Sequence, residues 1–173
     1  MDLRSRIRDV PDYPRPGIVF RDLTPLFLDP EALDHSISLL AAWAGEREAE
    51  YVVAAEARGF VLGGAVASRI GAGFVPARKP GRLPREVQSV EYALEYGVDA
   101  LEVHRDAIGG GSRVLVHDDL LATGGTAEAC CRLVEAAGGE VVGCAFLVEL
   151  GFLGGRERLG EREVHSLVVY DSE

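Results

Sequence analysis

The stretch VLVHDDLLATGGT, Val114–Thr126, decides the fold class of this 173-residue chain. It begins with the β-branched and aliphatic residues of a buried strand and continues through two adjacent aspartates. It ends in a Thr-Gly-Gly-Thr turn that opens a helical pattern. A strand that leads through a short turn into a helix is the repeating unit of α/β proteins with a parallel sheet. In such proteins, ligands bind outside the carboxyl ends of the strands.

The residues after this strand suit a phosphorylated sugar. The carboxylates of Asp118 and Asp119 can accept hydrogen bonds from ribose hydroxyls, and the amides and hydroxyls of the turn can hold a phosphate. The turn lacks the lysine of a Walker A motif, so it suits a single phosphate rather than a nucleoside triphosphate. The alternative is structural: one aspartate caps the turn and the other is solvated. That alternative accounts for one aspartate, but not for two at a strand's carboxyl end.

Hydrophobic periodicity divides the rest of the chain into alternating segments. We expect helices over the ranges 31–48, 60–70 and 126–137. We expect strands over the ranges 51–55, 74–77, 113–117, 141–148 and 164–170, with the last at a sheet edge. This alternation predicts an α/β fold with a central, mainly parallel sheet flanked by helices, in a single domain that spans 1–173.

Two regions break the alternation. Residues 11–25 contain four prolines, so we predict no regular secondary structure there. Because the same region carries Ile18, Val19 and Phe20, we expect an ordered loop over a pocket, within a small N-terminal hood formed by residues 1–30. Residues 78–104 begin rich in glycine and proline and then alternate in hydrophobicity. That pattern predicts a hairpin-like, flexible loop, a kind of excursion that often serves as a lid.

Composition narrows the function further. The formal net charge of −10 argues against a nucleic-acid surface, yet a local cluster of arginines can still bind a small phosphorylated ligand. Three cysteines without metal-like spacing indicate reduced, buried thiols. The first ten residues have no apolar core of a signal peptide, so we expect a cytoplasmic protein. Lys79 is the one lysine beside seventeen arginines, which makes it a candidate for a defined role.

Five segments together resemble the type I phosphoribosyltransferase family, and within it the members that act on adenine. They are PRPGIVFRDLTPLF (Pro14–Phe27), EARGF (Glu56–Phe60), RKPGRLP (Arg78–Pro84), EYALEYGVDALEVH (Glu91–His104) and the stretch quoted above. They occur in the family's order over essentially the whole chain. The resemblance implies transfer of the phosphoribosyl group from phosphoribosyl pyrophosphate to adenine, giving AMP and pyrophosphate. It also implies a homodimer and Mg²⁺. The ligand's own oxygens and water would hold most of the metal's coordination shell, and a direct contact with Asp118 or Asp119 is left open.

In this family, cations surround the pyrophosphate because negative charge builds on it as its bond to the sugar breaks. The resemblance assigns that role to Arg58, Arg78, Lys79 and Arg82, although the family commonly has a lysine at the position of Arg82. The residue matching Arg78 can reach the neighbouring subunit's site, which is the basis for expecting a dimer. The family also has a cis peptide bond at the position of Glu56–Ala57.

The resemblance assigns the sugar and the base as well. Asp118 and Asp119 would bind the ribose hydroxyls. The 5′-phosphate would be bound by residues of the turn, namely Ala122, Thr123, Gly124, Gly125 and Thr126. The backbone of Val19 and Arg21 would read adenine, with Phe20 and Leu120 on the two faces of the ring. A backbone edge offers one donor and one acceptor, a pairing that selects adenine over hypoxanthine.

The candidate catalytic residues lie in the LEYG segment. The resemblance places Glu95 near N7 of the purine, where it assists the proton balance, and Tyr96 where it closes the loop. One departure from the family is His117, where an aliphatic residue is usual. Because His117 alternates with the inward side chains of its strand, we expect a neutral, packed or hydrogen-bonded imidazole.

Two other functions compete. The first is the same reaction on an oxopurine, which calls for a side chain, commonly a lysine in a C-terminal strand, that reads the 6-oxo group; no lysine follows residue 79. The second is a non-catalytic regulator that binds phosphoribosyl pyrophosphate. Such proteins generally add a DNA-binding module, and neither the length nor the charge of this chain favours one.

Overall fold

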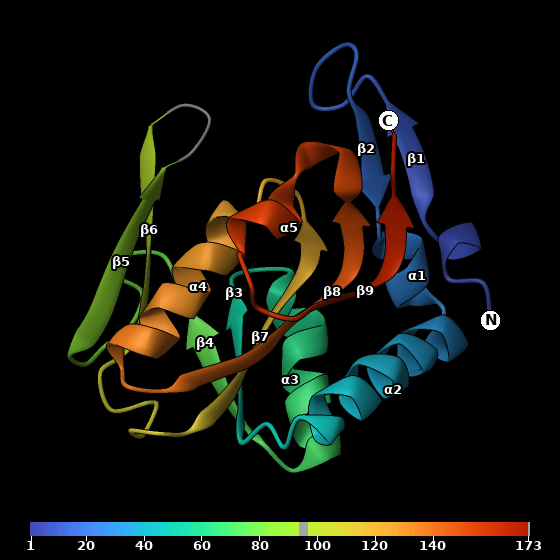
Figure 1. Cartoon of the computed structure of the whole chain (residues 1–173). Helices are drawn as coiled ribbons and strands as arrows, with labels where there is room; N and C mark the ends of the chain where they lie inside the picture. The colour runs from blue at the N-terminus through green and yellow to red at the C-terminus, as the bar shows by residue number, and fades with distance from the viewer. Residues whose placement is uncertain (94–96, 173) are drawn as a thin grey trace.

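A five-stranded parallel sheet forms the centre of the protein in a computed structural model that describes residues 1–93 and 97–172 (Figure 1). The strand order is β4-β3-β7-β8-β9, and every neighbouring pair is parallel. The strands are β3 (Tyr51–Ala55), β4 (Gly73–Ala77), β7 (Arg113–Leu121), β8 (Glu140–Leu150) and β9 (Val164–Tyr170). The predicted strand 164–170 therefore lies at an edge, as expected, and β7 and β8 are longer than predicted.

Helices cover both faces of the sheet. On one face pack α1 (Thr24–Leu28), α2 (Pro30–Glu46) and α3 (Gly59–Ile70), and on the other packs α4 (Gly125–Ala136). Short helices complete the chain: η1 (Arg4–Arg6), η2 (Gly151–Leu153) and α5 (Gly155–Arg158). Strands β3, β7 and β8 contribute residues to both hydrophobic cores, which explains their nearly continuous apolar sequences. The predicted α/β fold is confirmed.

The prediction of no regular structure over residues 11–25 is wrong. Strand β1 (Arg8–Pro11) pairs antiparallel with β2 (Val19–Asp22), and α1 begins inside the same region. The prolines avoid the positions where they would break hydrogen bonds. Pro11 ends a strand, two prolines lie in the connection between β1 and β2, and Pro25 lies in the first turn of α1.

The predicted hairpin over residues 78–104 is present. Strands β5 (Val87–Ala93) and β6 (Val98–His104) pair antiparallel. One face of the pair is buried against α4 and includes Val90, Tyr92 and Leu101. The predicted alternation through Leu94 and Tyr96 continues into residues 94–96, which lie outside the described residues.

All three cysteines are free and buried, as predicted. Burial raises the pKa of the Cys130 thiol well above its ordinary value, so this thiol stays protonated. No helix in the described part of the chain has the length and apolar character needed to cross a membrane.

Candidate active site

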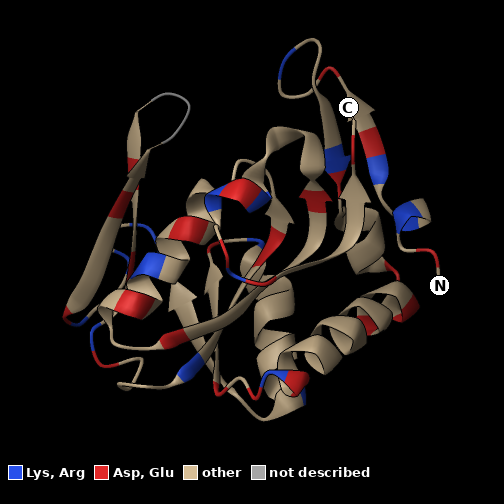
Figure 2. Cartoon of the chain, viewed as in Figure 1, with Lys and Arg blue, Asp and Glu red and all other residues tan. Residues whose placement is uncertain are grey.

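A cavity of about 220 Å³ lies at the carboxyl end of β7, where it meets α4. Its walls contain the aspartates and the glycine-rich turn that the sequence predicts, together with Arg58 from the end of β3. The lining residues are Arg58, Asp118, Asp119, Leu120, Leu121, Ala122, Thr123, Gly124, Gly125, Thr126 and Ala127. In Figure 2, acidic segments mark the same edge of the sheet, at the ends of β7 and β8. This is the edge at which α/β folds bind ligands.

The two aspartates form an unusual carboxyl pair. Asp119 is 3% exposed, and its backbone amide donates to Oδ1 of Asp118 at 2.9 Å. Burial raises the pKa of Asp118 well above its ordinary value, and the adjacent charge of Asp119 raises it further. Burial also raises the pKa of Asp119, although Arg58 opposes the shift. Oδ2 of Asp119 lies 2.9 Å from Nε of Arg58. The carboxyl pair therefore holds a proton more readily than two separate carboxyls would.

The turn between β7 and α4, residues 122–126, is called the phosphate loop below, after the role that the sequence predicts for it. Gly124 has a φ of +82°, a conformation that favours glycine, and α4 begins at Gly125 with free amides at its amino end. A Cβ on Gly124 would lie 2.5 Å from the carbonyl oxygen of Gly155. The loop is therefore packed tightly against α5, which supplies a supporting surface on the side away from the cavity.

Gly155 is a site residue that sequence reasoning missed. A Cβ at this position would overlap the carbonyl oxygen of Ala122 and lie 3.1 Å from the amide nitrogen of Gly124. The only sequence signal was the Gly-Gly pair at positions 154–155, which reads equally well as an ordinary turn.

Gly155→Ala is expected to raise KM for the predicted substrate, phosphoribosyl pyrophosphate, about tenfold or more, because the added methyl group pushes the phosphate loop out of place. Gly110→Ala is the matched control, since nothing lies within 4 Å of a Cβ there. Steady-state kinetics with each substrate varied in turn measures the effect. An unchanged KM for phosphoribosyl pyrophosphate in a folded Gly155→Ala protein would contradict the prediction.

The predicted pyrophosphate cations lie at the carboxyl ends of β3 and β4. Arg58 is half exposed and immediately precedes α3. It follows the Glu56–Ala57 peptide bond, which is cis as expected. Nε of Arg78 is buried without a hydrogen-bond partner and lies 3.5 Å from Oε1 of Glu56. The backbone amide of Lys79 donates to the same Glu56 oxygen at 2.5 Å. Glu56 thus orders this segment, a role that the sequence did not reveal.

Lys79 and Arg82 lie beyond β4. The ammonium of Lys79 pairs with Asp99 on β6, so it joins the hairpin to the sheet edge. The amide of Arg82 donates to the carbonyl of Lys79 at 3.3 Å, which closes a turn. A ligand that binds the ammonium of Lys79 must compete for it with the carboxylate of Asp99. The pair also involves Tyr92, whose hydroxyl lies 3.3 Å from the same Asp99 oxygen.

The predicted adenine segment is strand β2. The ring of Phe20 lies 5.7 Å from the guanidinium carbon of Arg58, which brings the hood close to the cavity, and Leu120 is in the cavity wall. Val19 is half-buried. The side chain of Arg21 is buried, pairs with Asp9 at 2.5 Å and packs on the ring of Tyr170. With its side chain engaged in these contacts, Arg21 would have to meet a base through its backbone, which is the contact that the resemblance implies. Glu95 and Tyr96 lie outside the described residues.

His117 is 1% exposed, and its Nδ1 lies 2.9 Å from the carbonyl oxygen of Ala145, so Nδ1 donates. Burial lowers its pKa to about 4. The imidazole is neutral and packed, as predicted. Because it is buried in the core, it does not line the cavity.

The free energy of unfolding is expected to fall by roughly 3 kcal/mol through His117 alone between pH 6.5 and pH 4. Because the folded pKa lies below the unfolded value of 6.5, the unfolded state binds the extra proton first as pH falls. His117→Leu removes this component. Urea unfolding of both proteins at several pH values gives the difference, and parallel curves would contradict the prediction.

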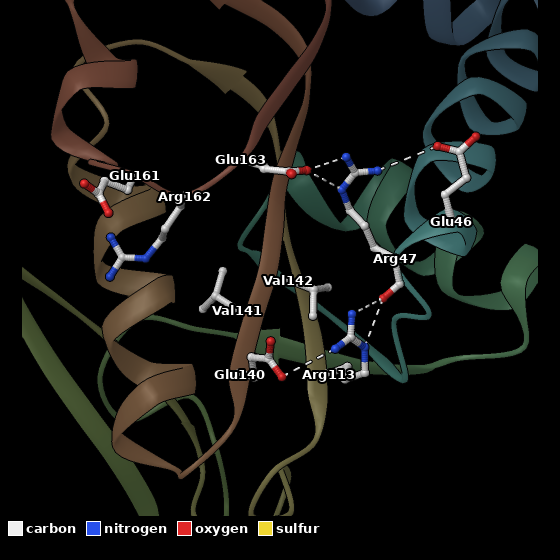
Figure 3. A pocket seen from close by; sticks show the side chains of 9 residues that line it. All are labelled: Glu46, Arg47, Arg113, Glu140, Val141, Val142, Glu161, Arg162 and Glu163. Carbon is white, nitrogen blue, oxygen red and sulfur yellow. Dashed lines mark hydrogen bonds and ion pairs between the residues drawn. The ribbon is translucent and has the colours of Figure 1, made fainter.

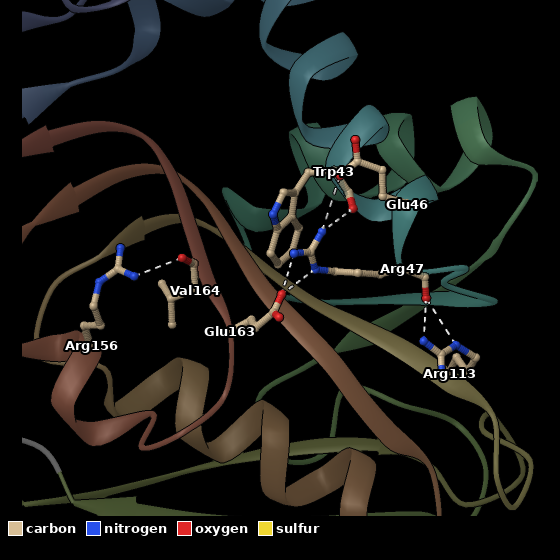
Figure 4. A network of polar contacts seen from close by, with 7 residues as sticks. All are labelled: Trp43, Glu46, Arg47, Arg113, Arg156, Glu163 and Val164. Atoms are coloured by element: carbon tan, nitrogen blue, oxygen red, sulfur yellow. Dashed lines mark hydrogen bonds and ion pairs between the residues drawn. The ribbon is translucent and has the colours of Figure 1, made fainter.

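A larger groove of about 840 Å³ lies at the opposite edge of the sheet (Figure 3). Its arginines are already engaged. Arg47 pairs with Glu163 and packs over the ring of Trp43, and Arg113 donates to the carbonyl of Arg47 (Figure 4). Arg162 pairs with Glu135 at 2.6 Å. With its cations neutralised by neighbouring groups, this groove is a weaker candidate for binding phosphates than the cavity at β7.

Comparisons with known proteins agree with this geometry. Residues 29–171 match the phosphoribosyl transferase domain family. The chain is 60% identical over 169 residues to the adenine phosphoribosyltransferase of Rubrobacter xylanophilus, covering 97% of this chain and 91% of that protein. The crystal structure of adenine phosphoribosyltransferase from Thermoanaerobacter pseudethanolicus superposes with a TM-score of 0.94 at 48% identity, covering 98% of each chain. The Saccharomyces cerevisiae enzyme superposes with a TM-score of 0.91 at 37% identity, covering 96% of each chain.

Fold, site and family match together define a type I phosphoribosyltransferase. The similarity to adenine phosphoribosyltransferases extends over nearly the whole chain, at 55–60% identity over 97–98% of its residues. The chain belongs to the adenine phosphoribosyltransferases, enzymes that convert adenine and phosphoribosyl pyrophosphate to AMP and pyrophosphate in purine salvage.

Proposed function

We propose that the cavity at β7 carries out this transfer with a fixed division of labour. The phosphate loop holds the 5′-phosphate, and the aspartate pair accepts hydrogen bonds from the 2′ and 3′ hydroxyls. The observation that carries the proposal is the single cavity that joins Asp118 and Asp119 to the amides of residues 122–126 and to Arg58. A sugar phosphate bound there would turn its anomeric carbon toward the pyrophosphate cations.

The chemical step follows from charge. As the bond from the anomeric carbon to pyrophosphate breaks, positive charge builds on the ribose and negative charge on the leaving group. Arg58, Arg78, Lys79 and Arg82 stabilise the leaving group in this proposal. Asp118 and Asp119, beneath the sugar, stabilise the ribose. Glu95 balances the proton near N7 of adenine, and Tyr96 helps to exclude water.

Mg²⁺ completes the proposed substrate, since it neutralises pyrophosphate charge when bound. Within residues 1–93 and 97–172, no three His, Cys, Asp or Glu side chains gather into a group that could hold a metal ion. Both aspartates already have neighbours, because Oδ1 of Asp118 accepts from Asp119 and Oδ2 of Asp119 faces Arg58. These residues fit a cation that arrives on the ligand's phosphate oxygens and completes its shell with water.

The proposed base site is the edge of β2, with the backbone of Val19 and Arg21 toward adenine and Phe20 and Leu120 on its faces. A solved relative supports a base site in this fold, because the Saccharomyces cerevisiae structure is a complex with adenine. Homodimer formation, which would bring Arg78 to a neighbouring site, and a cytoplasmic location are also part of the proposal. Sedimentation equilibrium tests the first of these.

The test of the function is direct. The protein is incubated with Mg²⁺, phosphoribosyl pyrophosphate and one purine base at a time, and nucleotides are separated by chromatography. We expect AMP from adenine and no product from hypoxanthine, guanine or xanthine. Product from an oxopurine would overturn the base-specificity argument. Ligand binding without any nucleotide would favour a non-catalytic regulator instead.

A further inference from the structure

Helix α5 (Gly155–Arg158) lies directly behind the phosphate loop. The contacts of Gly155 with Ala122 and of Gly124 with Gly155 leave no room for a side chain on either glycine. A Cβ on Gly124 would also lie 3.2 Å from Cβ of Arg158. The position of α5 therefore determines the path that the loop backbone can take.

Two arginines fix α5 on opposite sides. Arg156 makes two hydrogen bonds to the carboxylate of Glu149 on β8, at 3.0 and 2.6 Å. It makes a third to the carbonyl of Val164 at 2.9 Å, which Figure 4 shows. Arg158 donates from Nε to Glu128 on α4 at 2.7 Å. A four-residue helix thus connects to β8, to the segment that begins β9 and to α4.

In the ion pair between Glu149 and Arg156, the glutamate lies in the protein interior and the arginine is half exposed. Glu149 is 4% exposed, and the hydroxyl of Ser166 donates to the same carboxylate at 2.6 Å. Burial alone would raise the pKa of Glu149, but the hydrogen bonds from Arg156 and Ser166 outweigh it and hold the pKa below its ordinary value. Because three hydrogen bonds hold the buried carboxylate of Glu149 in one orientation, its two bonds to Arg156 also fix the position of the guanidinium group.

We propose that α5 is a buttress for the phosphate loop, and that Arg156 and Arg158 are positioning residues that set its affinity for a phosphomonoester. Neither arginine lines the cavity. Both act through the backbone of Gly155 and Gly124. Because the loop binds through amides whose directions are fixed by the backbone, a small displacement weakens several hydrogen bonds at once. The inference rests on the proposed role of the loop as the 5′-phosphate site.

The test compares AMP with adenosine, which differ only in the 5′-phosphate. Isothermal titration calorimetry of both ligands gives the ratio of their dissociation constants, which isolates the contribution of the phosphate. Arg156→Lys keeps the charge but loses the bidentate geometry, and Arg158→Met loses the contact with Glu128. Each variant is expected to lower the preference for AMP about tenfold or more while adenosine affinity stays unchanged.

Arg47→Lys is the matched control. It alters a comparable arginine–glutamate pair at the opposite edge of the sheet, so its preference for AMP should equal that of the wild type. If Arg156→Lys does not fold, Ser166→Ala removes only one donor to Glu149 and keeps the test open. A wild-type preference retained in folded Arg156→Lys and Arg158→Met would overturn the buttress. A wild type without any preference for AMP would instead overturn the proposed phosphate site.

Discussion

Asp118→Asn is expected to lower kcat/KM about hundredfold and, at the same time, to raise Tm at pH 7. The activity falls because a hydrogen bond to a charged group is worth roughly 1.5–3 kcal/mol and the ribose loses such a partner. The stability rises because the folded protein confines two adjacent carboxyls in a buried site. Their raised pKa values show that the folded state disfavours their ionised forms.

The sign of the pH dependence is specific. A carboxyl whose folded pKa lies above its unfolded value of 3.8 loses stability as pH rises above 3.8, and the loss is complete once pH has passed the folded pKa. Removing one member of the pair relieves this cost at neutral pH, and an asparagine oxygen can still accept from the amide of Asp119. Each kcal/mol relieved raises Tm by roughly 2–4 °C in a chain of this size.

Calorimetry and steady-state kinetics on the same preparation measure both effects. Asp106→Asn is the control, since Asp106 is exposed and pairs with Arg85 on the surface, where such pairs contribute little. A lower Tm together with lost activity would indicate general damage to the fold and would count against the charge argument.

Glu95→Gln is expected to reduce kcat by about 10²- to 10⁴-fold without loss of stability. The expectation rests on the LEYG segment, because Glu95 lies outside the described residues, between the end of β5 at Ala93 and the start of β6 at Val98. A glutamine keeps the shape of the side chain but cannot exchange a proton near N7. The pH–rate profile should lose the limb that reports this carboxyl.

Glu91→Gln is the control for that variant. It makes the same chemical change on an exposed residue of the same hairpin, and its carbonyl, which accepts from Arg132 at 3.0 Å, is left intact. Circular dichroism and Tm should match the wild type in both variants. A Glu95→Gln protein with near-normal kcat would remove Glu95 from the mechanism.

Hydrophobic patterns along the chain predicted most of the fold. The ranges of β3 and β9 follow directly from their apolar runs, and α4 and its turn follow from the glycines after β7. The N-terminal region was predicted wrongly, because proline counts alone do not show which backbone groups lack a partner. Proline at the end of β1 and in the first turn of α1 leaves the remaining residues free to pair.

The sequence by itself determined which chemical groups reach the carboxyl edge of the sheet, because strand direction and turn composition are local properties. Asp118, Asp119, Arg58 and the phosphate loop meet there for that reason. Only the tertiary structure decided which residues support these groups from the side away from the cavity. The contact of Gly155 with Ala122, and the hold of Glu149 on Arg156, join segments whose proximity depends on how β8 and α5 pack against β7 and α4. Such contacts form between distant parts of the chain, so no local pattern records them.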